Sequence, residues 1–177
     1  MSTRRFILAV VFLSVTAFAT TVVPASVERL TAQSTHVTLA RAIDNRSLWD
    51  ASHGRIYTLT RFQAVRMMKG SLPTIFTVKR LGGHLDGYNM KVAGVREWQP
   101  GDNTVLFLQP DVDGNFIVTG LMQGDFRVVR SSAGVLTVNN GVRGARQLDA
   151  SGQLTDFQGS RMSLNELEQR VRKAAAQ

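Results

Sequence analysis

The segment from Gly54 to Gly83, GRIYTLTRFQAVRMMKGSLPTIFTVKRLGG, limits the possible folds of this chain more than any other feature. Its residues are mainly β-branched, aromatic or charged, a composition that favours β-strands over helices. Lys69-Gly70-Ser71-Leu72-Pro73 interrupts it, because glycine and proline mark turns and proline is confined to strand starts and edges. We therefore predict two strands here, Arg55 to Met68 and Thr74 to Arg80, with a corner at Lys69-Gly70.

The first of these predicted strands does not alternate cleanly between apolar and polar residues. Its apolar residues fall on both parities, with Ile56, Phe62 and Ala64 on one and Leu59, Val65 and Met67 on the other. A β-bulge inserts one extra residue and exchanges the two faces of a strand, and it also bends the strand. We therefore predict a bulge within Arg55 to Met68 and a curved, closing sheet.

Several shorter runs also have strand character. Val37 to Asn45 alternates apolar and polar residues, and Val105 to Leu108 is apolar throughout, which is typical of a strand buried on both faces. Three more predicted strands follow, each bounded by glycine turns: Phe116 to Thr119, Phe126 to Arg130 and Val135 to Asn139. Short strands without helices between them predict a mainly β fold, a barrel or a sandwich. The predicted core contains Ile56, Leu59, Val65, Val78, Leu106, Leu108, Phe116 and Val118.

Two short helices are predicted outside this β region. Ser26 to Gln33 places apolar residues at helical spacing behind a serine N-cap, and Ser163-Leu164-Asn165-Glu166 is a capping box. The second motif predicts an amphipathic helix that ends near Ala175. The stretch between the last predicted strand and this helix is rich in Gly, Gln, Ser and Asp. We accordingly divide the chain into a β-domain (26–140), a linker (141–161) and a C-terminal helix (162–177).

The first 25 residues have the layout of a secretory signal peptide. Arg4 and Arg5 precede an uncharged, apolar run from Phe6 to Val15, and small residues follow at the positions a signal peptidase requires. Cuts after Ala19 and after Ala25 both fit. Thr3-Arg4-Arg5 leaves a twin-arginine route open, and an uncleaved anchor is the alternative to cleavage. We predict an exported protein, periplasmic or extracellular.

Composition narrows the function classes further. The chain contains no cysteine, which excludes thiol catalysis, thiolate metal sites and disulfides. About 150 residues remain after the signal peptide, enough for one domain with its own core. The formal charge of +8 falls to about +6 without Arg4 and Arg5, and the basic residues are scattered singly along the chain. That distribution is typical of a soluble surface with a mild positive bias.

An ordered series of short motifs runs through the β region: Ile56-Tyr57-Thr58, Lys69-Gly70, Gly82-Gly83, Gly101-Asp102, Leu106-Phe107-Leu108 and Gly120-Leu121-Met122-Gln123-Gly124. In this order they resemble a group of uncharacterised exported bacterial proteins, over roughly residues 27–129. The layout is in turn similar to the netrin-like module of the tissue inhibitors of metalloproteinases. That resemblance implies an OB-like barrel of five or slightly more strands. It also implies protease inhibition, although inhibitors of that type chelate zinc through an N-terminal cysteine, which this chain lacks.

Candidate metal and catalytic residues are few. His84-Leu85-Asp86, with His53 and Asp50, would be the best zinc ligands, but we interpret them as loop residues and predict no metal. Asp111, Asp113 and Asn115 resemble a calcium loop in part, although the spacing fits a hairpin turn on Asp113-Gly114 better. No serine lies in a G-x-S-x-G context, and no pair of carboxylates is placed for hydrolysis. We therefore predict neither a cofactor nor enzymatic activity.

With metal binding and catalysis not predicted, a binding module is the function class that remains. The OB class includes binders of single-stranded nucleic acid, and Arg61, Phe62, Arg66, Phe76, Lys79 and Arg80 offer the required residue types. Export and a core role for the phenylalanines argue against that function, so we expect no nucleic acid. We predict instead a protein partner, with weak contact to anionic lipid as the alternative. The loops Ser47 to Gly54 and Gly82 to Tyr88 supply the candidate binding residues: Trp49, His53, Gly82, Gly83, His84, Asp86 and Tyr88.

Overall fold

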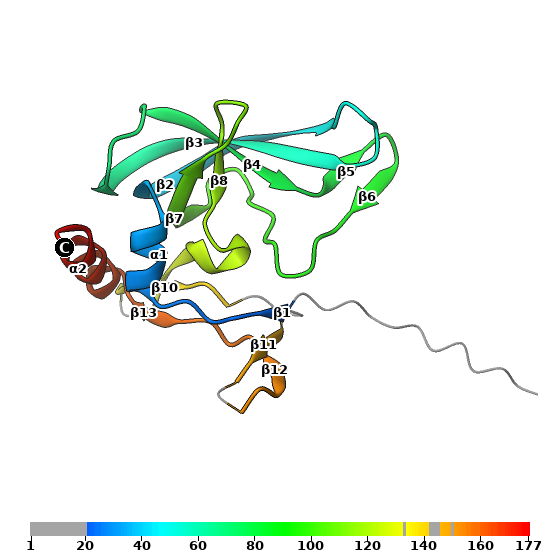
Figure 1. The fold of residues 1–177 in the computed structure, drawn as a ribbon. Coiled ribbons are helices and arrows are strands. Elements are labelled where there is room, and N and C mark those ends of the chain that lie inside the picture. Colours follow the sequence, from blue (N-terminus) through cyan, green and yellow to red (C-terminus); the bar gives the residue numbers. More distant parts are fainter. Residues whose placement is uncertain (1–20, 133, 142–145, 150) are drawn as a thin grey trace, which may run out of the picture.

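A computed structural model describes residues 21–132, 134–141, 146–149 and 151–177 of the chain (Figure 1). The predicted hydrophobic run of the signal peptide lies outside these residues, so the signal peptide stays a prediction. Among the described residues, no helix is long and apolar enough to cross a membrane.

Five strands close into a barrel. They are β2 (His36–Trp49), β3 (Ile56–Lys69), β4 (Ile75–Leu81), β7 (Asn103–Pro110) and β8 (Phe116–Val118). The first three form an antiparallel meander, and β7 pairs with the free edge of β2. Strand β8 then pairs antiparallel with β7 and parallel with β4, which closes the sheet. The predicted OB-like, five-stranded barrel is thereby confirmed.

The pairing of β2 with β3 contains the predicted bulge, and more than one. The register of the two strands shifts at three places. At these shifts Val65 and Met68 on β3, and Ile43 on β2, are left without a partner. Val65 is 55% exposed, so its prediction as a core residue is wrong, because the bulge removes it from the inward face.

Strand β7 separates two hydrophobic cores. Leu106 and Leu108 point into the barrel, whereas Val105 and Phe107 belong to a second cluster outside it, and all four are fully buried. The barrel core contains Ala40, Ala42, Phe62, Phe76, Val78, Trp98, Leu106 and Leu108. The predicted burial of this strand on both faces is confirmed. Of the other predicted core residues, Ile56 and Val78 are buried, Phe116 and Val118 pack against the barrel core, and Leu59 is half-buried.

Helix α1 (Val27–Gln33) covers the outer core and explains the Lys69-Gly70 corner. Ser26 is its N-cap and accepts a hydrogen bond from Arg29 N, as predicted. At the other end, Lys69 Nζ donates to the carbonyls of Thr31 (2.7 Å) and Ser34 (2.8 Å), where a cation offsets the negative end of the helix. Gly70 follows with φ +66°, and a Cβ there would lie 2.6 Å from Thr35 O.

The sheet continues beyond the barrel on the far edge of β7. Strands β9 (Asp125–Arg130), β10 (Leu136–Asn139) and β13 (Arg161–Ser163) add to it in turn, and α2 (Leu164–Ala175) follows directly. Ser163 is the N-cap of α2, as predicted, because its Oγ accepts a hydrogen bond from Glu166 N. Leu164, Leu167 and Val171 of α2 are buried in the outer core beside α1 (Figure 1).

The remaining elements are small. Strands β1 (Thr21–Val22), β11 (Arg146–Leu148) and β12 (Leu154–Asp156) form a separate sheet, so two strands lie within the predicted linker. Residues 142–145 and 150 of that linker lie outside the described residues, and the domain boundaries stay predictions. Strands β5 (Gly83–Leu85) and β6 (Tyr88–Met90) make a hairpin, and η1 (Leu121–Gly124) is a short 3-10 helix.

Two loop predictions need correction. Ser47, Leu48 and Trp49 belong to β2, where Trp49 pairs with Ile56, so the predicted loop from Ser47 begins only at Asp50. The predicted loop from Gly82 to Tyr88 contains β5, the turn at Asp86-Gly87 and the first residue of β6, with which β5 forms a hairpin. In both cases cross-strand pairing extends order into a segment whose composition alone resembles a loop.

Leu106→Ala should lower the free energy of unfolding by about 2–5 kcal/mol, because it leaves a cavity in a close-packed barrel. Leu154→Ala is the matched control, since Leu154 is 50% exposed on β12, and it should change stability by about 0.5 kcal/mol or less. Chemical denaturation of both variants measures the difference. Equal effects would show that Leu106 is not part of the core.

A bidentate ion pair joins the two helices and makes stability depend on pH. Arg170 Nε and Nη2 donate to the Glu28 carboxylate at 2.8 and 2.9 Å. The hydrogen bond from Arg170 is the main reason that the pKa of Glu28 falls from 4.5 to about 2. A lowered folded-state pKa stabilises the fold above the unfolded pKa of 4.5, and this contribution is lost as pH falls through about 2.

Glu28→Gln removes this contribution. The stability advantage of the wild type over Glu28→Gln should therefore be full above pH 4.5 and disappear as pH approaches 2. Glu97→Gln is the control, because Glu97 is exposed and makes no ion pair among the described residues. Urea denaturation at several pH values gives both curves. A constant difference for Glu28→Gln across this range would contradict the interpretation.

Candidate functional site

Four of the predicted binding residues meet at one end of the barrel. Trp49 Nε1 donates to Asp86 Oδ2 at 2.8 Å, which ties the end of β2 to the β5–β6 turn. The Trp49 ring lies 5.4 Å from the ring of Tyr88 in an edge-to-face arrangement and 6.1 Å from the ring of His53. We call Trp49, His53 and Tyr88 the aromatic cluster. Its geometry falls within the range of favourable aromatic pairs.

Two tight turns bring the aromatic cluster together. In the β2–β3 turn, Asp50 Oδ1 accepts hydrogen bonds from the amides of Gly54 (2.8 Å) and Arg55 (3.1 Å). In the β5–β6 turn, Asp86 and Gly87 have φ values of +51° and +80°, the backbone that an Asp-Gly hairpin turn requires. The side chains that the cluster presents are therefore fixed by their own hairpins.

The aromatic cluster lines an open hollow of about 490 Å³. Ile56, Met90 and Lys91 line it together with the three rings. Tyr88 is 65% exposed, and Trp49 is half-buried beside it. A large aromatic surface that is held rigid and left in solvent is typical of a protein-binding site.

The other three predicted residues have different positions. Gly82 and Gly83 are buried beneath the hairpin, and a Cβ on Gly83 would lie 2.4 Å from Thr58 Oγ1. His84 is exposed and lines a neighbouring hollow of about 320 Å³. We call this hollow the polar recess; its lining includes the charged residues Arg80, Lys91 and Glu97 together with His84. The glycines thus allow close packing, and His84 lies beside the cluster rather than in it.

The structure assigns the candidate metal ligands to other roles. Among the described residues, no group of three or more His, Asp or Glu side chains is placed to hold a metal ion. The turn on Asp113-Gly114 is confirmed, because Asp111 N donates to Asn115 O and Gly114 has φ +76°. Lys79 Nζ donates to the carboxylates of Asp113 and Asp111, which raise the pKa of this lysine.

The phenylalanines considered for nucleic-acid stacking are core residues. Phe62 and Phe76 are 0% and 4% exposed, and their rings stack at 5.7 Å inside the barrel. The interpretation of both as core residues is confirmed. Neither ring is accessible to a base.

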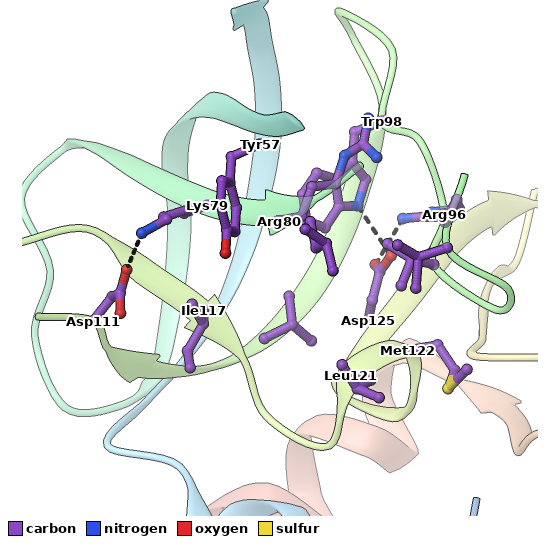
Figure 2. Close-up of a pocket in the computed structure, with 14 residues that line it drawn as sticks. Tyr57, Lys79, Arg80, Arg96, Trp98, Asp111, Ile117, Leu121, Met122 and Asp125 are labelled. Carbon is purple, nitrogen blue, oxygen red and sulfur yellow. Dashed lines mark hydrogen bonds and ion pairs between the residues drawn. The ribbon is translucent and has the colours of Figure 1, made fainter. Parts of the chain in front are cut away.

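A second site, which was not predicted from the sequence, lies between β4, β8, η1 and the irregular segment 91–102. It is a cavity of about 300 Å³, and we call it the β4–β8 cavity. Figure 2 shows its polar ends, where Lys79 points to Asp111 on one side and Trp98 and Arg96 point to Asp125 on the other. The lining between them is mainly apolar and includes Leu81, Val92, Val95, Ile117, Val118, Leu121 and Met122.

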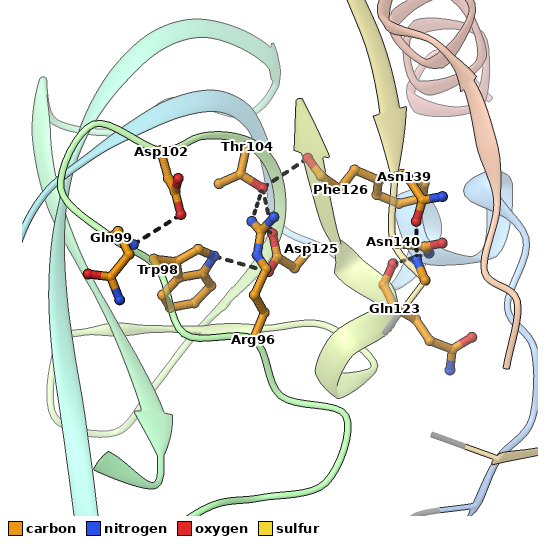
Figure 3. Close-up of polar contacts among 11 residues, drawn as sticks. Arg96, Trp98, Gln99, Asp102, Thr104, Gln123, Asp125, Phe126, Asn139 and Asn140 are labelled. Atoms are coloured by element: carbon orange, nitrogen blue, oxygen red, sulfur yellow. Dashed lines mark hydrogen bonds and ion pairs between the residues drawn. The ribbon is translucent and has the colours of Figure 1, made fainter. Parts of the chain in front are cut away.

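A buried carboxylate forms one wall of this cavity (Figure 3). Asp125 accepts hydrogen bonds from Arg96 Nη2 (2.7 Å), Trp98 Nε1 (3.0 Å) and the Thr104 hydroxyl. Burial raises the pKa of the Asp125 carboxyl, and these three donors offset part of that rise. The Thr104 hydroxyl also lies 2.9 Å from Phe126 O, so its one proton serves either acceptor at a time. This network fixes Arg96 and Trp98 against β7 and β9.

Weak signals for these residues were present in the sequence. Arg80 has the same parity in β4 as Phe76 and Val78, which point into the barrel, so an arginine stands where alternation predicts an inward-facing side chain. Asp125 follows the Gly120 to Gly124 motif directly and precedes the apolar Phe126. Trp98 had no comparable signal, because it lies in an irregular segment.

Comparison with known proteins assigns no family. No protein-family model matches the chain, and a search of curated proteins gives no match. The resemblance to netrin-like modules therefore rests on the motifs quoted above.

Arg96→Ala should lower the free energy of unfolding by about 3–5 kcal/mol, because it leaves the buried Asp125 without its cation. Arg61→Ala is the matched control, since Arg61 also pairs with an aspartate, Asp44, but 57% of its side chain is exposed. Removing that surface pair should cost about 1 kcal/mol or less. Thermal or chemical unfolding compares the two. Similar losses would show that the Asp125 network does not stabilise the barrel.

Proposed function

We propose that the protein is an exported, non-enzymatic binding module that engages a protein partner through its aromatic cluster. One observation carries this proposal: Trp49, His53 and Tyr88 gather at the barrel end, where Tyr88 and His53 are exposed and Trp49 is half-buried between them. Rigid aromatic side chains lose little conformational entropy on binding, which is why tryptophan and tyrosine dominate interface hot spots.

Charges around the aromatic cluster favour a partner with acidic residues. Arg55, which follows the β2–β3 turn, and Lys91, which lines the hollow, are exposed, and neither makes an ion pair among the described residues. Asp86 is engaged by Trp49 and Asp50 by its own turn. Complementary charge speeds association and excludes basic partners. An exported protease is the partner that the netrin-like resemblance suggests, by surface contact rather than zinc chelation, since the chain has no cysteine.

Contacts of the first described residues bear on where the mature chain begins. Ala25 N donates to Gln123 Oε1 at 2.7 Å, and Gln123 Nε2 donates to Val23 O at 3.2 Å. A signal-peptide cut after Ala19 keeps both contacts, whereas a cut after Ala25 removes them. We therefore propose Thr20 as the first residue of the exported protein.

Attachment to anionic lipid through α2 is less well supported. Of the three cations that would make this contact, Arg170 pairs with Glu28 and Arg172 pairs with Glu168. The apolar side chains of α2 are buried in the outer core. This helix therefore offers a lipid surface little unpaired charge beyond Lys173.

Trp49→Ala tests the proposed interface. The mature protein, immobilised and exposed to the secreted fraction of its native cells, should recover a partner at both 150 mM and 500 mM salt. Trp49→Ala and Tyr88→Ala should each weaken recovery roughly 30-fold or more, the effect of losing a hot-spot side chain. Val129→Ala is the control, because Val129 is 48% exposed on β9, away from the cluster.

The outcomes separate the two functions. Equal recovery by wild type and Trp49→Ala would exclude the aromatic cluster as the interface. Binding to phosphatidylglycerol vesicles that disappears at 500 mM salt, with no protein recovered, would favour the lipid function instead, because salt screens surface charge. Circular dichroism of each variant verifies that it is folded.

A further inference from the structure

The β4–β8 cavity exposes apolar side chains at its mouth. Leu121 is 55% exposed and Ile117 is 38% exposed, and both line the cavity. Leu121 also has φ +57°, directly after Gly120 at φ +65°. A leucine in the left-handed region is strained, because its Cβ lies too close to the backbone, and such strain is concentrated at functional sites. The backbone therefore holds a leucine side chain at the opening at an energetic cost.

Three cations line the cavity, and one of them has no anionic partner. Lys79 is paired with Asp111 and Asp113, and Arg96 is paired with Asp125. Arg80 makes neither an ion pair nor a side-chain hydrogen bond among the described residues, and its Nε is buried. Burial lowers the pKa of the Arg80 guanidinium, which Glu97 offsets only in part. Arg80 is half-buried, so its charge is partly desolvated, and an acidic ligand would supply the close opposite charge that it lacks.

Arg80 and Trp98 also line the polar recess, so they form the wall between an apolar cavity and a polar hollow. The recess contains two cations, Arg80 and Lys91, and one acid, Glu97. The local charge therefore favours an anion at this wall. Apolar surface on one side of Arg80 and excess positive charge on the other are complementary to a molecule with an apolar body and an acidic head.

We propose that the β4–β8 cavity binds a small amphipathic anion, an alkyl or acyl chain that carries a single acidic head group. The chain lies against Val118, Ile117, Leu121 and the Trp98 ring, and the head pairs with Arg80. The head replaces the missing partner of that guanidinium, and the chain covers the apolar mouth. A volume of about 300 Å³ is at the lower end of the range for ligand pockets, which limits the chain to a short one.

This site is separate from the proposed protein interface. The hollow of the aromatic cluster and the β4–β8 cavity share no lining residue, and Trp49 does not line the cavity. Trp49→Ala should therefore bind the ligand as the wild type does. The two proposals can fail independently.

Octanoate is the first probe, with calorimetry of the mature wild-type protein as the measurement. Hexanoate should bind roughly 15-fold more weakly, because each buried methylene contributes about fourfold in affinity. 1-Octanol, which has the same chain and no charge, should bind at least tenfold more weakly than octanoate. Octylammonium should not bind measurably, because its head repels Arg80. Octyl phosphate separates a fatty acid from a phospholipid-derived ligand, since the tighter of the two anions identifies the head group.

Arg80→Gln isolates the role of the charge. It should weaken octanoate at least tenfold and leave the affinity for 1-octanol unchanged, while Arg80→Lys should retain part of the preference for the anion. Arg46→Gln is the matched control, an exposed arginine on β2 that does not line the cavity. Val95→Phe fills the cavity and should abolish binding of both octanoate and 1-octanol.

Three results would overturn the proposal. Equal affinity of the wild type for octanoate and 1-octanol would remove Arg80 as an anchor. Undiminished octanoate binding by Val95→Phe would place the ligand outside the cavity. Absence of binding by both anions at millimolar concentration would exclude an amphipathic anion of this kind. The head-group and chain-length series use only the wild-type protein, so the proposal remains testable even if Arg80→Gln fails to fold.

Discussion

The fold depends on the burial of both faces of one strand, β7. One edge of β7 pairs with β2, and the other pairs with β8 and β9. Leu106 and Leu108 fill the barrel, while Val105 and Phe107 anchor the layer formed by α1 and α2. Each of these buried side chains contributes about 1.5–3 kcal/mol. Because the same strand closes the barrel and carries the outer core, neither part can be loosened without affecting the other.

Local composition predicted the strands well but could not predict their pairing. The apolar run around Leu106 indicated burial on both faces, and the Lys69-Gly70 corner was predicted from residue type alone. Register is different, because it depends on which residues of two distant strands meet. The bulge at Val65 therefore exposed a residue that alternation placed in the core, and pairing with β3 extended β2 as far as Trp49.

For the candidate sites, too, the residue types could be predicted from the sequence, but their arrangement in space could not. Trp49 and Tyr88 were predicted as binding residues from their type and their place near turns, but their contact requires the β2–β3 and β5–β6 hairpins to lie side by side. The β4–β8 cavity combines residues from β3, β4, β8, β9 and the segment 91–102. In the sequence, only the inward parity of Arg80 and the position of Asp125 after the Gly120 to Gly124 motif indicated it. Sites assembled from distant segments become visible only once the topology is known.

Two charged groups that line the β4–β8 cavity, Asp125 and Arg80, differ in whether the protein supplies a partner of opposite charge. Asp125 is buried, yet it accepts hydrogen bonds from three donors, one of them the Arg96 cation, so the protein itself offsets the cost of burying that carboxylate. Arg80 has no such partner among the described residues, and Leu121 nearby adopts a strained backbone that exposes its side chain. Residues whose local conformation or charge environment is unfavourable for stability are expected mainly at functional sites. The β4–β8 cavity thus has a rigid wall, fixed by the Asp125 network, and a cation without a close anion, Arg80. A pre-formed anion site requires this combination.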